Sequence, residues 1–198
     1  MVKKSIYVRR IVPILIAAIV IAIFISGCEE ATVTSQREKF SSVKVEHSRN
    51  FYTVGTVSKS AASDAQEGVI ETSKSYLEAA YLDLISAKSD SYQSDLLSFI
   101  SEDSFDRFKV DWHNLSLGGS AGGLKSIEEK KLKVPYVTVQ FDKSKKPKLG
   151  TFQYILDVKY KKDNKTMKLN TYGWLVLEKQ GNDWKIFDYY AKQHIGEG

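Results

Sequence analysis

The spacing of apolar residues divides the chain, after about residue 60, into a helical half and a strand-like half. From residue 64 to about 87, apolar side chains recur every three or four positions, which predicts one long amphipathic helix. Two shorter helices are predicted over residues 92–100 and 101–112. Two pairs at the start of the long stripe have capping-box spacing, so we expect this helix to begin at Ser63 or Asp64. The pairs are Ser63–Gln66 and Asp64–Glu67.

A glycine-rich segment at residues 118–123 ends the helical pattern, and apolar and polar residues alternate after it. The alternation is strict over residues 151–160, as expected for a strand with one buried face. Short turn sequences at residues 163–164 and 181–182 separate the last three strands, which predicts an antiparallel meander. Pro135 predicts a bulge or turn in the preceding strand, because proline cannot donate to a central ladder.

These elements predict an α+β fold in which three N-terminal helices pack on one side of a curved antiparallel sheet. We assign residues 63–198 to this domain. Residues 29–62 are rich in Ser, Thr and charged side chains, and we assign them to a flexible tether. The one apolar patch of the tether, residues 51–57, has the composition of a short strand that docks onto the domain.

The first 28 residues have the order of an export signal: basic, then apolar, then small. Four basic residues precede an uncharged, almost wholly apolar run from Ile11 to Ile25, and Ser26, Gly27 and Cys28 follow it. Basic residues ahead of an apolar segment hold that end in the cytoplasm. We therefore expect the rest of the chain on the extracytoplasmic side of the cell membrane.

Two alternatives remain for Cys28, the only cysteine of the chain. The tetrad from Ile25 to Cys28 resembles the bacterial lipobox, in which the cysteine is lipidated and becomes the new N-terminus. Alternatively, the segment from Ile11 to Cys28 stays as an anchor helix, because about 17 to 25 apolar residues suffice to span the hydrocarbon core. Either route tethers the domain to a membrane.

Net charge is informative only when it is divided along the chain. The formal charge is +5, but four positive charges lie before Cys28, so the exported part is nearly neutral. Residues 28–123 carry 9 basic and 15 acidic side chains, whereas residues 124–198 carry 16 basic and 9 acidic ones. This asymmetry can orient the domain against a partner, a second copy or anionic lipid, or it can reflect ordinary solvated faces. The near neutrality of the exported part argues against direct binding of nucleic acid.

The closing stretch from Leu177 to Tyr189 contains a turn followed by Trp-Lys-Ile, an aromatic residue and an acid. This hairpin and the order of the predicted elements resemble the nuclear transport factor two-like cone over about residues 64–192. A short cytoplasmic tail, one membrane segment, a tether and a lone cone are similar to the VirB-eight-like components of type IV secretion and conjugation machines. The resemblance implies a scaffold, not an enzyme, that contacts other channel subunits and is able to self-associate.

Candidates for other chemistry are few. In enzymes that share the cone, a carboxylate or histidine acts as proton shuttle, and the candidates here are Asp157 and Asp188. Asp157 lies opposite the aromatic face of its strand, which argues against that role. His47, His113 and His194 lack the spacing of metal ligands. We expect no catalytic residue, no metal and no cofactor.

Aromatic residues of the last three strands can pack the core, line a cone cavity or form a docking surface. We therefore expect the chain to act in channel assembly by protein–protein contact through the sheet. The alternative is a surface lipoprotein that binds a small ligand or a cell-wall component in the cone. The expected interaction residues are Tyr154, Tyr172, Trp174, Phe187 and Tyr189.

Overall fold

The computed structural model describes residues 38–40 and 46–198. The expected signal or anchor at residues 1–28, including Cys28, lies outside the described residues, as does the tether up to residue 37. Among the described helices, none is both long and apolar enough to cross a membrane.

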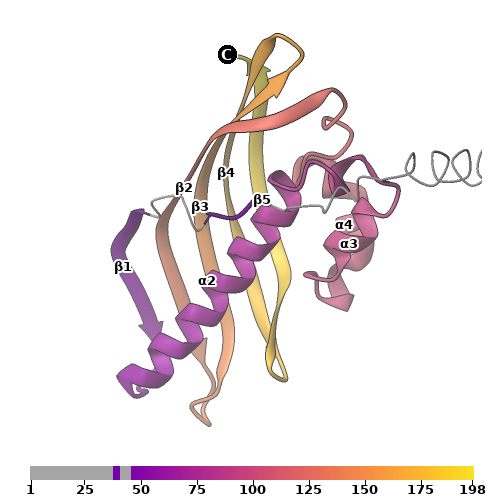
Figure 1. Ribbon diagram of the computed structural model, residues 1–198. Coiled ribbons are helices and arrows are strands. Elements are labelled where there is room, and N and C mark those ends of the chain that lie inside the picture. The colour runs from indigo at the N-terminus through magenta and orange to yellow at the C-terminus, as the bar shows by residue number, and fades with distance from the viewer. Residues whose placement is uncertain (1–37, 41–45) are drawn as a thin grey trace, which may run out of the picture. The chain divides into compact units, whose positions relative to one another are not determined.

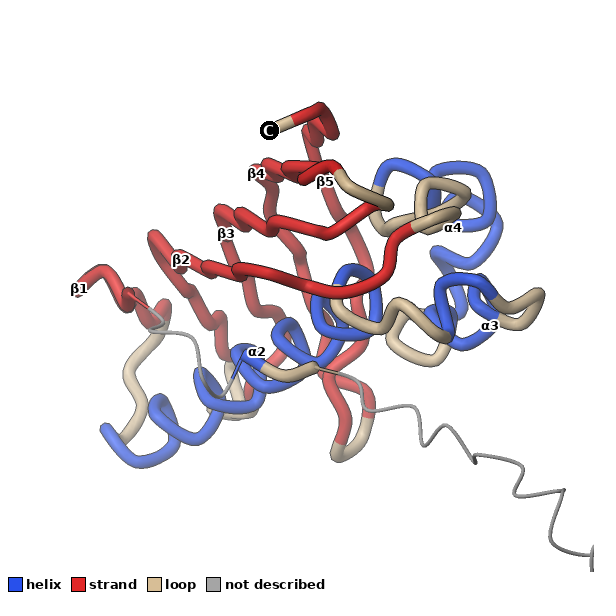
Figure 2. Tube along the Cα trace, turned by 45° about the horizontal axis from the view of Figure 1, so that its top comes forward, coloured by secondary structure: helices blue, strands red, loops and turns tan. Residues whose placement is uncertain are grey.

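Five strands form one curved sheet that does not close on itself (Figures 1 and 2). Their order in the sheet follows the sequence, and the last four form an antiparallel meander. The first strand pairs with the second in parallel, so the sheet is mixed and the expectation of a wholly antiparallel sheet is wrong. The strands are β1 (Glu46–Val54), β2 (Leu124–Phe141), β3 (Pro147–Lys162), β4 (Lys165–Gln180) and β5 (Asp183–Glu197).

The helices lie between β1 and β2 in the sequence, which confirms the α+β class. The long helix α2 crosses the inner face of the sheet, and the short helices lie beside β5 (Figures 1 and 2). The helix count differs from the prediction, because three 3₁₀ turns interrupt the short helical segments. The helical elements are α2 (Lys59–Tyr81), η2 (Ser86–Lys88), α3 (Tyr92–Leu97), η3 (Glu102–Ser104), α4 (Phe105–Asp111) and η4 (Trp112–Asn114).

The start of α2 lies earlier than the sequence pattern predicts. Ser58 has extended backbone angles, and its hydroxyl oxygen accepts a hydrogen bond from the Ala61 N–H at 3.2 Å. This contact satisfies one of the N–H groups that a helix leaves free at its first turn. Ser63 and Asp64, the predicted first residues, therefore lie inside the helix.

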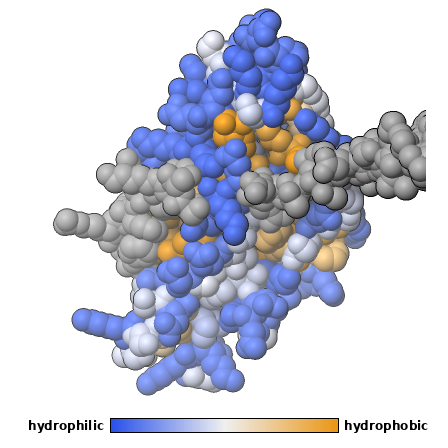
Figure 3. Space-filling view, viewed as in Figure 1, coloured by the Kyte–Doolittle hydropathy of each residue, from blue (hydrophilic) through white to orange (hydrophobic). Residues whose placement is uncertain are grey.

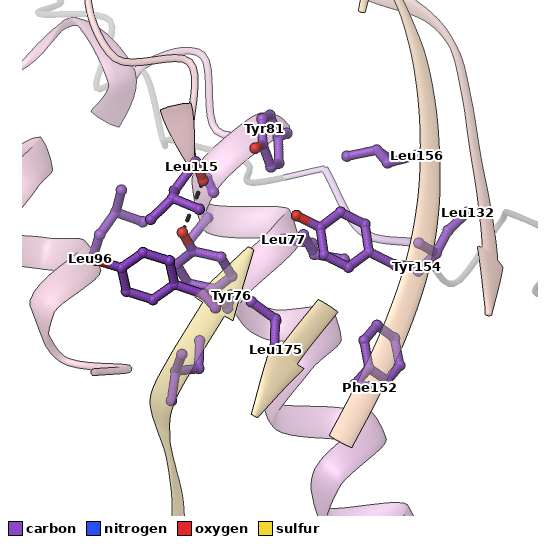
Figure 4. Packing of buried hydrophobic residues seen from close by; sticks show 14 of the residues in the cluster. Tyr76, Leu77, Tyr81, Leu96, Leu115, Leu132, Phe152, Tyr154, Leu156 and Leu175 are labelled. Carbon is purple, nitrogen blue, oxygen red and sulfur yellow. Dashed lines mark hydrogen bonds between the residues drawn. The ribbon is translucent and has the colours of Figure 1, made fainter. Parts of the chain in front are cut away.

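The core fills the space between α2 and the inner face of the sheet. From residue 152 to residue 160 of β3, every second side chain faces inward, as the alternation predicted, and each of these is at most 1% exposed. Figure 4 shows Tyr154 and Leu156 pointing from β3 toward α2. The buried β3 residues are Phe152, Tyr154, Leu156, Val158 and Tyr160.

Part of the predicted tether belongs to this core. Phe40 is 1% exposed, and its N–H donates a hydrogen bond to the Glu78 carboxylate on α2 at 2.7 Å. Glu38 forms an ion pair with Lys130 on β2. The strand β1 also falls within residues 29–62 and overlaps the apolar patch at residues 51–57, which was expected to dock onto the domain as a short strand.

Hydrophilic residues cover most of the face that carries α2. Hydrophobic residues show there only in limited patches (Figure 3). The apolar side chains of the helical half are thus largely used in packing against the sheet.

Candidate protein-interaction surface

Several buried tyrosine hydroxyls donate hydrogen bonds to backbone carbonyls in the interior. Tyr76 donates to the Leu115 carbonyl at 2.8 Å, Tyr92 to the Ala80 carbonyl at 2.5 Å and Tyr160 to the Tyr81 carbonyl at 2.9 Å. Burial raises the pKa of the Tyr76, Tyr81 and Tyr160 hydroxyls well above the ordinary value, because ionised oxygens would lose their hydration. These hydroxyls therefore serve as neutral structural donors.

Two of the five expected interaction residues belong to the interior. Tyr154 is 0% exposed, and its ring lies against Gly173 of β4. Tyr189 is 8% exposed, because the Arg107 guanidinium lies 4.1 Å above its ring centre and Phe108 packs on it edge to face. Both side chains contribute to packing rather than to an exposed surface.

The other three lie on the outer face of the sheet, on the side opposite α2. Tyr172 and Phe187 are each 41% exposed, and Trp174 is half-buried. Trp174 stacks on Tyr190, which is 42% exposed, with 4.4 Å between the ring centres and 19° between the ring planes. We call Tyr172, Trp174, Phe187 and Tyr190 the outer aromatic patch.

Strand register holds these side chains together. Trp174 of β4 pairs with Gln153 of β3 on one side and Tyr190 of β5 on the other. The Gln153 amide nitrogen donates to the Tyr172 hydroxyl at 2.6 Å. Because cross-strand neighbours in a sheet lie in contact, Tyr172, Trp174 and Tyr190 form one continuous surface, and Phe187 lies next to it at the β5 bulge.

A bulge in β5 separates Tyr189, one of the expected interaction residues, from Tyr190, which was not among them. Ile186 faces inward and pairs with Leu177, whereas the preceding β4 residue, Val176, pairs with Asp188. The extra residue reverses the alternation, so Tyr189 turns inward and Tyr190 outward. Simple alternation from Ile186 would predict the opposite, and no turn residue in the sequence marks the bulge.

The edge of β5 is held by helix α4. The Arg107 guanidinium lies 2.6 Å from the Asp188 carboxylate and donates to the Tyr189 carbonyl at 3.1 Å. Desolvation, the largest single effect, acts to lower the Arg107 pKa, but the hydrogen bond to Asp188 and the charge interactions with Asp188 and Tyr189 together raise that pKa. Ser104 adds a hydrogen bond to the Phe187 carbonyl at 2.5 Å. These contacts occupy backbone groups that an edge strand otherwise exposes.

Neither candidate proton shuttle faces the packed interior. Asp188 is part of the Arg107 ion pair, and its side chain is 46% exposed. Asp157 lies on the outer face and accepts a hydrogen bond from the Asn170 amide at 2.6 Å. His113 and His194 are exposed, and no cluster of three or more metal-ligating side chains occurs among the described residues.

No protein-family model matches the chain, and no curated protein matches it either.

Proposed function

We propose that this protein is a membrane-anchored scaffold of a bacterial type IV secretion or conjugation channel. The outer aromatic patch contacts other channel subunits, and the N-terminal segment holds the domain on the extracytoplasmic side of the cell membrane. The curved sheet crossed by α2 supports a relationship to the nuclear transport factor two-like cone.

One observation carries the proposal of a contact surface. Three aromatic side chains on the neighbouring strands β4 and β5 are each 41–42% exposed, and one of them, Tyr190, stacks on the half-buried Trp174. Contiguous exposed apolar surface of this kind marks interaction sites, and Trp and Tyr are enriched among the residues that contribute most to binding. The inner face gives less support to a ligand in the cone, because tyrosine and phenylalanine side chains fill the space beneath α2.

The test is a pull-down of the full-length chain from its native membrane in mild detergent, with crosslinking. The double variant Tyr172→Ala/Tyr190→Ala should reduce recovery of channel subunits by about 30-fold or more, the effect of losing a major contact residue. The matched control is Ile85→Ala/Val110→Ala, which also removes two exposed apolar side chains but on the helical side. Circular dichroism should show native folding in both variants.

Three outcomes would contradict the proposal. The first is recovery of the same subunits by the patch variant and by the unaltered chain. The second is recovery of only its own copies by the unaltered chain, which would indicate a homo-oligomer. Recovery of the chain alone would favour a surface lipoprotein with a ligand in the cone.

The two routes of anchoring differ in one measurement. Lipidation of Cys28 predicts a mature chain that begins at Cys28 and carries a mass increase on its N-terminal peptide, and Cys28→Ser should abolish both that increase and the shortening of the chain. An uncleaved anchor predicts an unmodified full-length chain, and Cys28→Ser should then leave membrane retention unchanged.

A further inference from the structure

The hairpin that joins β2 to β3 carries a dense cluster of unpaired positive charge. Four of the six residues from 143 to 148 are lysines, and all four are exposed. Within the described part of the chain, none of the four ammonium groups takes part in an ion pair or a side-chain hydrogen bond. We call Lys143, Lys145, Lys146 and Lys148 the basic hairpin.

Asp142, the one acidic residue of this loop, forms hydrogen bonds with backbone groups of the loop. Its carboxylate accepts the N–H groups of Ser144 and Lys146 at 2.8 and 2.9 Å, and its own N–H donates to the Lys146 carbonyl at 2.8 Å. Lys145 has a φ of +62°, a left-handed conformation that glycine adopts at less cost. The loop therefore presents its lysines on a defined backbone, which lowers the entropy lost on binding.

The opposite end of the sheet also carries several lysines, but three of them are paired with glutamates. Lys159 pairs with Glu129, Lys161 with Glu128 at 3.8 Å and Lys165 with Glu197 at 2.6 Å. The hydrogen bond that Lys159 donates to Glu129 lowers the pKa of Glu129, and the one that Lys165 donates to Glu197 raises the pKa of Lys165. A high local number of lysines therefore does not by itself leave lysines unpaired, and the unpaired ammonium groups are a particular feature of the basic hairpin.

The length of the tether determines what the basic hairpin can reach. Glu38 is bound to β2, and Phe40 is bound to Glu78 near the C-terminal end of α2. The basic hairpin lies at the other end of the sheet, where α2 begins (Figure 1). The helix from Lys59 to Glu78 spans about 28 Å. The ten residues from Cys28 to Glu38 span at most about 35 Å when extended. A domain anchored at Cys28 can therefore bring the hairpin to the membrane surface.

We propose that the basic hairpin docks on the phosphate groups of anionic phospholipids in the membrane that anchors the chain. This inference rests on the anchoring proposed above. Four lysines on one short loop bind weakly from solution, but a tether raises their effective concentration near the bilayer. Each lysine near an anionic surface adds about fivefold to the partition, so four give roughly several hundredfold. Docking would fix which end of the sheet faces the bilayer.

The full-length chain is reconstituted into vesicles of phosphatidylcholine, with or without an equal amount of phosphatidylglycerol. Acetylation of lysines is followed by mass spectrometry. The four hairpin lysines should react several-fold more slowly when phosphatidylglycerol is present, and high salt should restore their reactivity. Lys159, Lys161, Lys162 and Lys165 serve as the internal control, and their reactivity should not depend on the lipid.

A variant tests the same contact directly. Ser144→p-benzoylphenylalanine places a photo-crosslinker at the hairpin tip, and it should crosslink to phosphatidylglycerol. The fourfold Lys→Gln change at 143, 145, 146 and 148 should reduce this crosslinking at least tenfold. The matched change at 159, 161, 162 and 165 should leave it intact.

Equal protection in both vesicle types would overturn the inference, as would crosslinking that ignores the hairpin lysines. A crosslink to a protein instead of lipid in native membranes would also overturn it. Failure of anchoring shows separately as loss of the chain in a carbonate wash. Failure of the scaffold proposal shows in the pull-down of the Tyr172→Ala/Tyr190→Ala variant, which retains the hairpin.

Discussion

Two glycines set how closely the layers of the core approach. A Cβ at Gly150 would lie 2.3 Å from Cγ2 of Val69, so its absence lets α2 rest directly on β3. A Cβ at Gly173 would lie 2.3 Å from the Tyr190 carbonyl oxygen and 2.8 Å from the Tyr154 hydroxyl. Gly173 therefore lies directly against the backbone of Tyr190, a member of the outer aromatic patch, and against the buried side chain of Tyr154. There is no room for a side chain at this position of β4.

Replacing this glycine should disturb both faces of the sheet. We expect Gly173→Ala to lower the free energy of unfolding by about 1–3 kcal/mol, the usual cost of overpacking. Urea denaturation measures the change. Gly122→Ala is the control, because a Cβ there meets no atom within 4 Å. Equal stability of the two variants would show that β4 adjusts without cost.

Phe40 provides a second test at the residue scale. Phe40→Ala removes a side chain that is 1% exposed, so we expect a loss of about 3–5 kcal/mol in the free energy of unfolding. The neighbouring Lys39 is exposed, and Lys39→Ala should change stability by less than about 0.5 kcal/mol. Thermal denaturation of the full-length variants distinguishes the two. An unaltered midpoint for Phe40→Ala would place residues 38–40 outside the folded domain.

At the scale of elements, the first residue of α2 in the structure differs from the one that the sequence pattern predicts. The Ser58 side chain caps the helix, whereas the pattern predicted a start at Ser63 or Asp64. The first turn contains Ser60, Ala61 and Ala62, which show no apolar period and therefore left the earlier start undetected. Helix boundaries depend on a few backbone hydrogen bonds, which periodicity does not report.

The two capping candidates differ in the stability they provide. Ser58→Ala should cost about 1 kcal/mol, because an Ala61 N–H loses its acceptor. Ser63→Ala should have little effect or a slightly favourable one, since alanine is the better residue inside a helix. Chemical denaturation of both variants measures the difference, and the opposite ranking would restore the predicted start at Ser63.

The strands show which features the sequence could predict. Alternation over 151–160 correctly predicted the buried side of β3, and the turns at 163–164 and 181–182 correctly predicted the meander. The register shift around Pro135 confirms the predicted bulge. The bulge at Phe187 and the parallel pairing of β1 were not predictable, because both depend on hydrogen bonds between distant segments. The composition of the candidate surface was therefore only partly foreseen.

For the whole molecule, buried tyrosines predict how stability depends on pH. Burial raises the pKa of four interior hydroxyls above the ordinary value of 10, and the pKa of Tyr189 is raised to about 12. Above pH 10 the unfolded chain therefore binds fewer protons than the folded one, and the free energy of unfolding falls as pH rises. The four interior hydroxyls belong to Tyr76, Tyr81, Tyr154 and Tyr160.

We expect the free energy of unfolding to fall steeply at alkaline pH, by an amount that depends on the number of buried tyrosines. Each fully buried tyrosine should remove about 1.4 kcal/mol of stability between pH 8 and pH 11. Tyr154→Phe should reduce the total loss by about that amount, because one ionisable hydroxyl disappears. Urea denaturation at the two pH values measures the loss, with tyrosine absorbance recording ionisation. An unchanged loss in the variant would mean that Tyr154 ionises in the folded state.

The parallel pairing of β1 with β2 also has a mechanical consequence. Once Phe40 has been drawn from its pocket, tension on the chain acts at the first residue of β1. If the opposite end of the sheet is held, that tension runs along the strand and loads the hydrogen bonds between β1 and β2 in shear, all at once. By contrast, two strands that are pulled apart at the same end break their hydrogen bonds one at a time, at a lower force. The β1–β2 pair, which is nearest the tether, is therefore arranged to resist a pulling force on the tether.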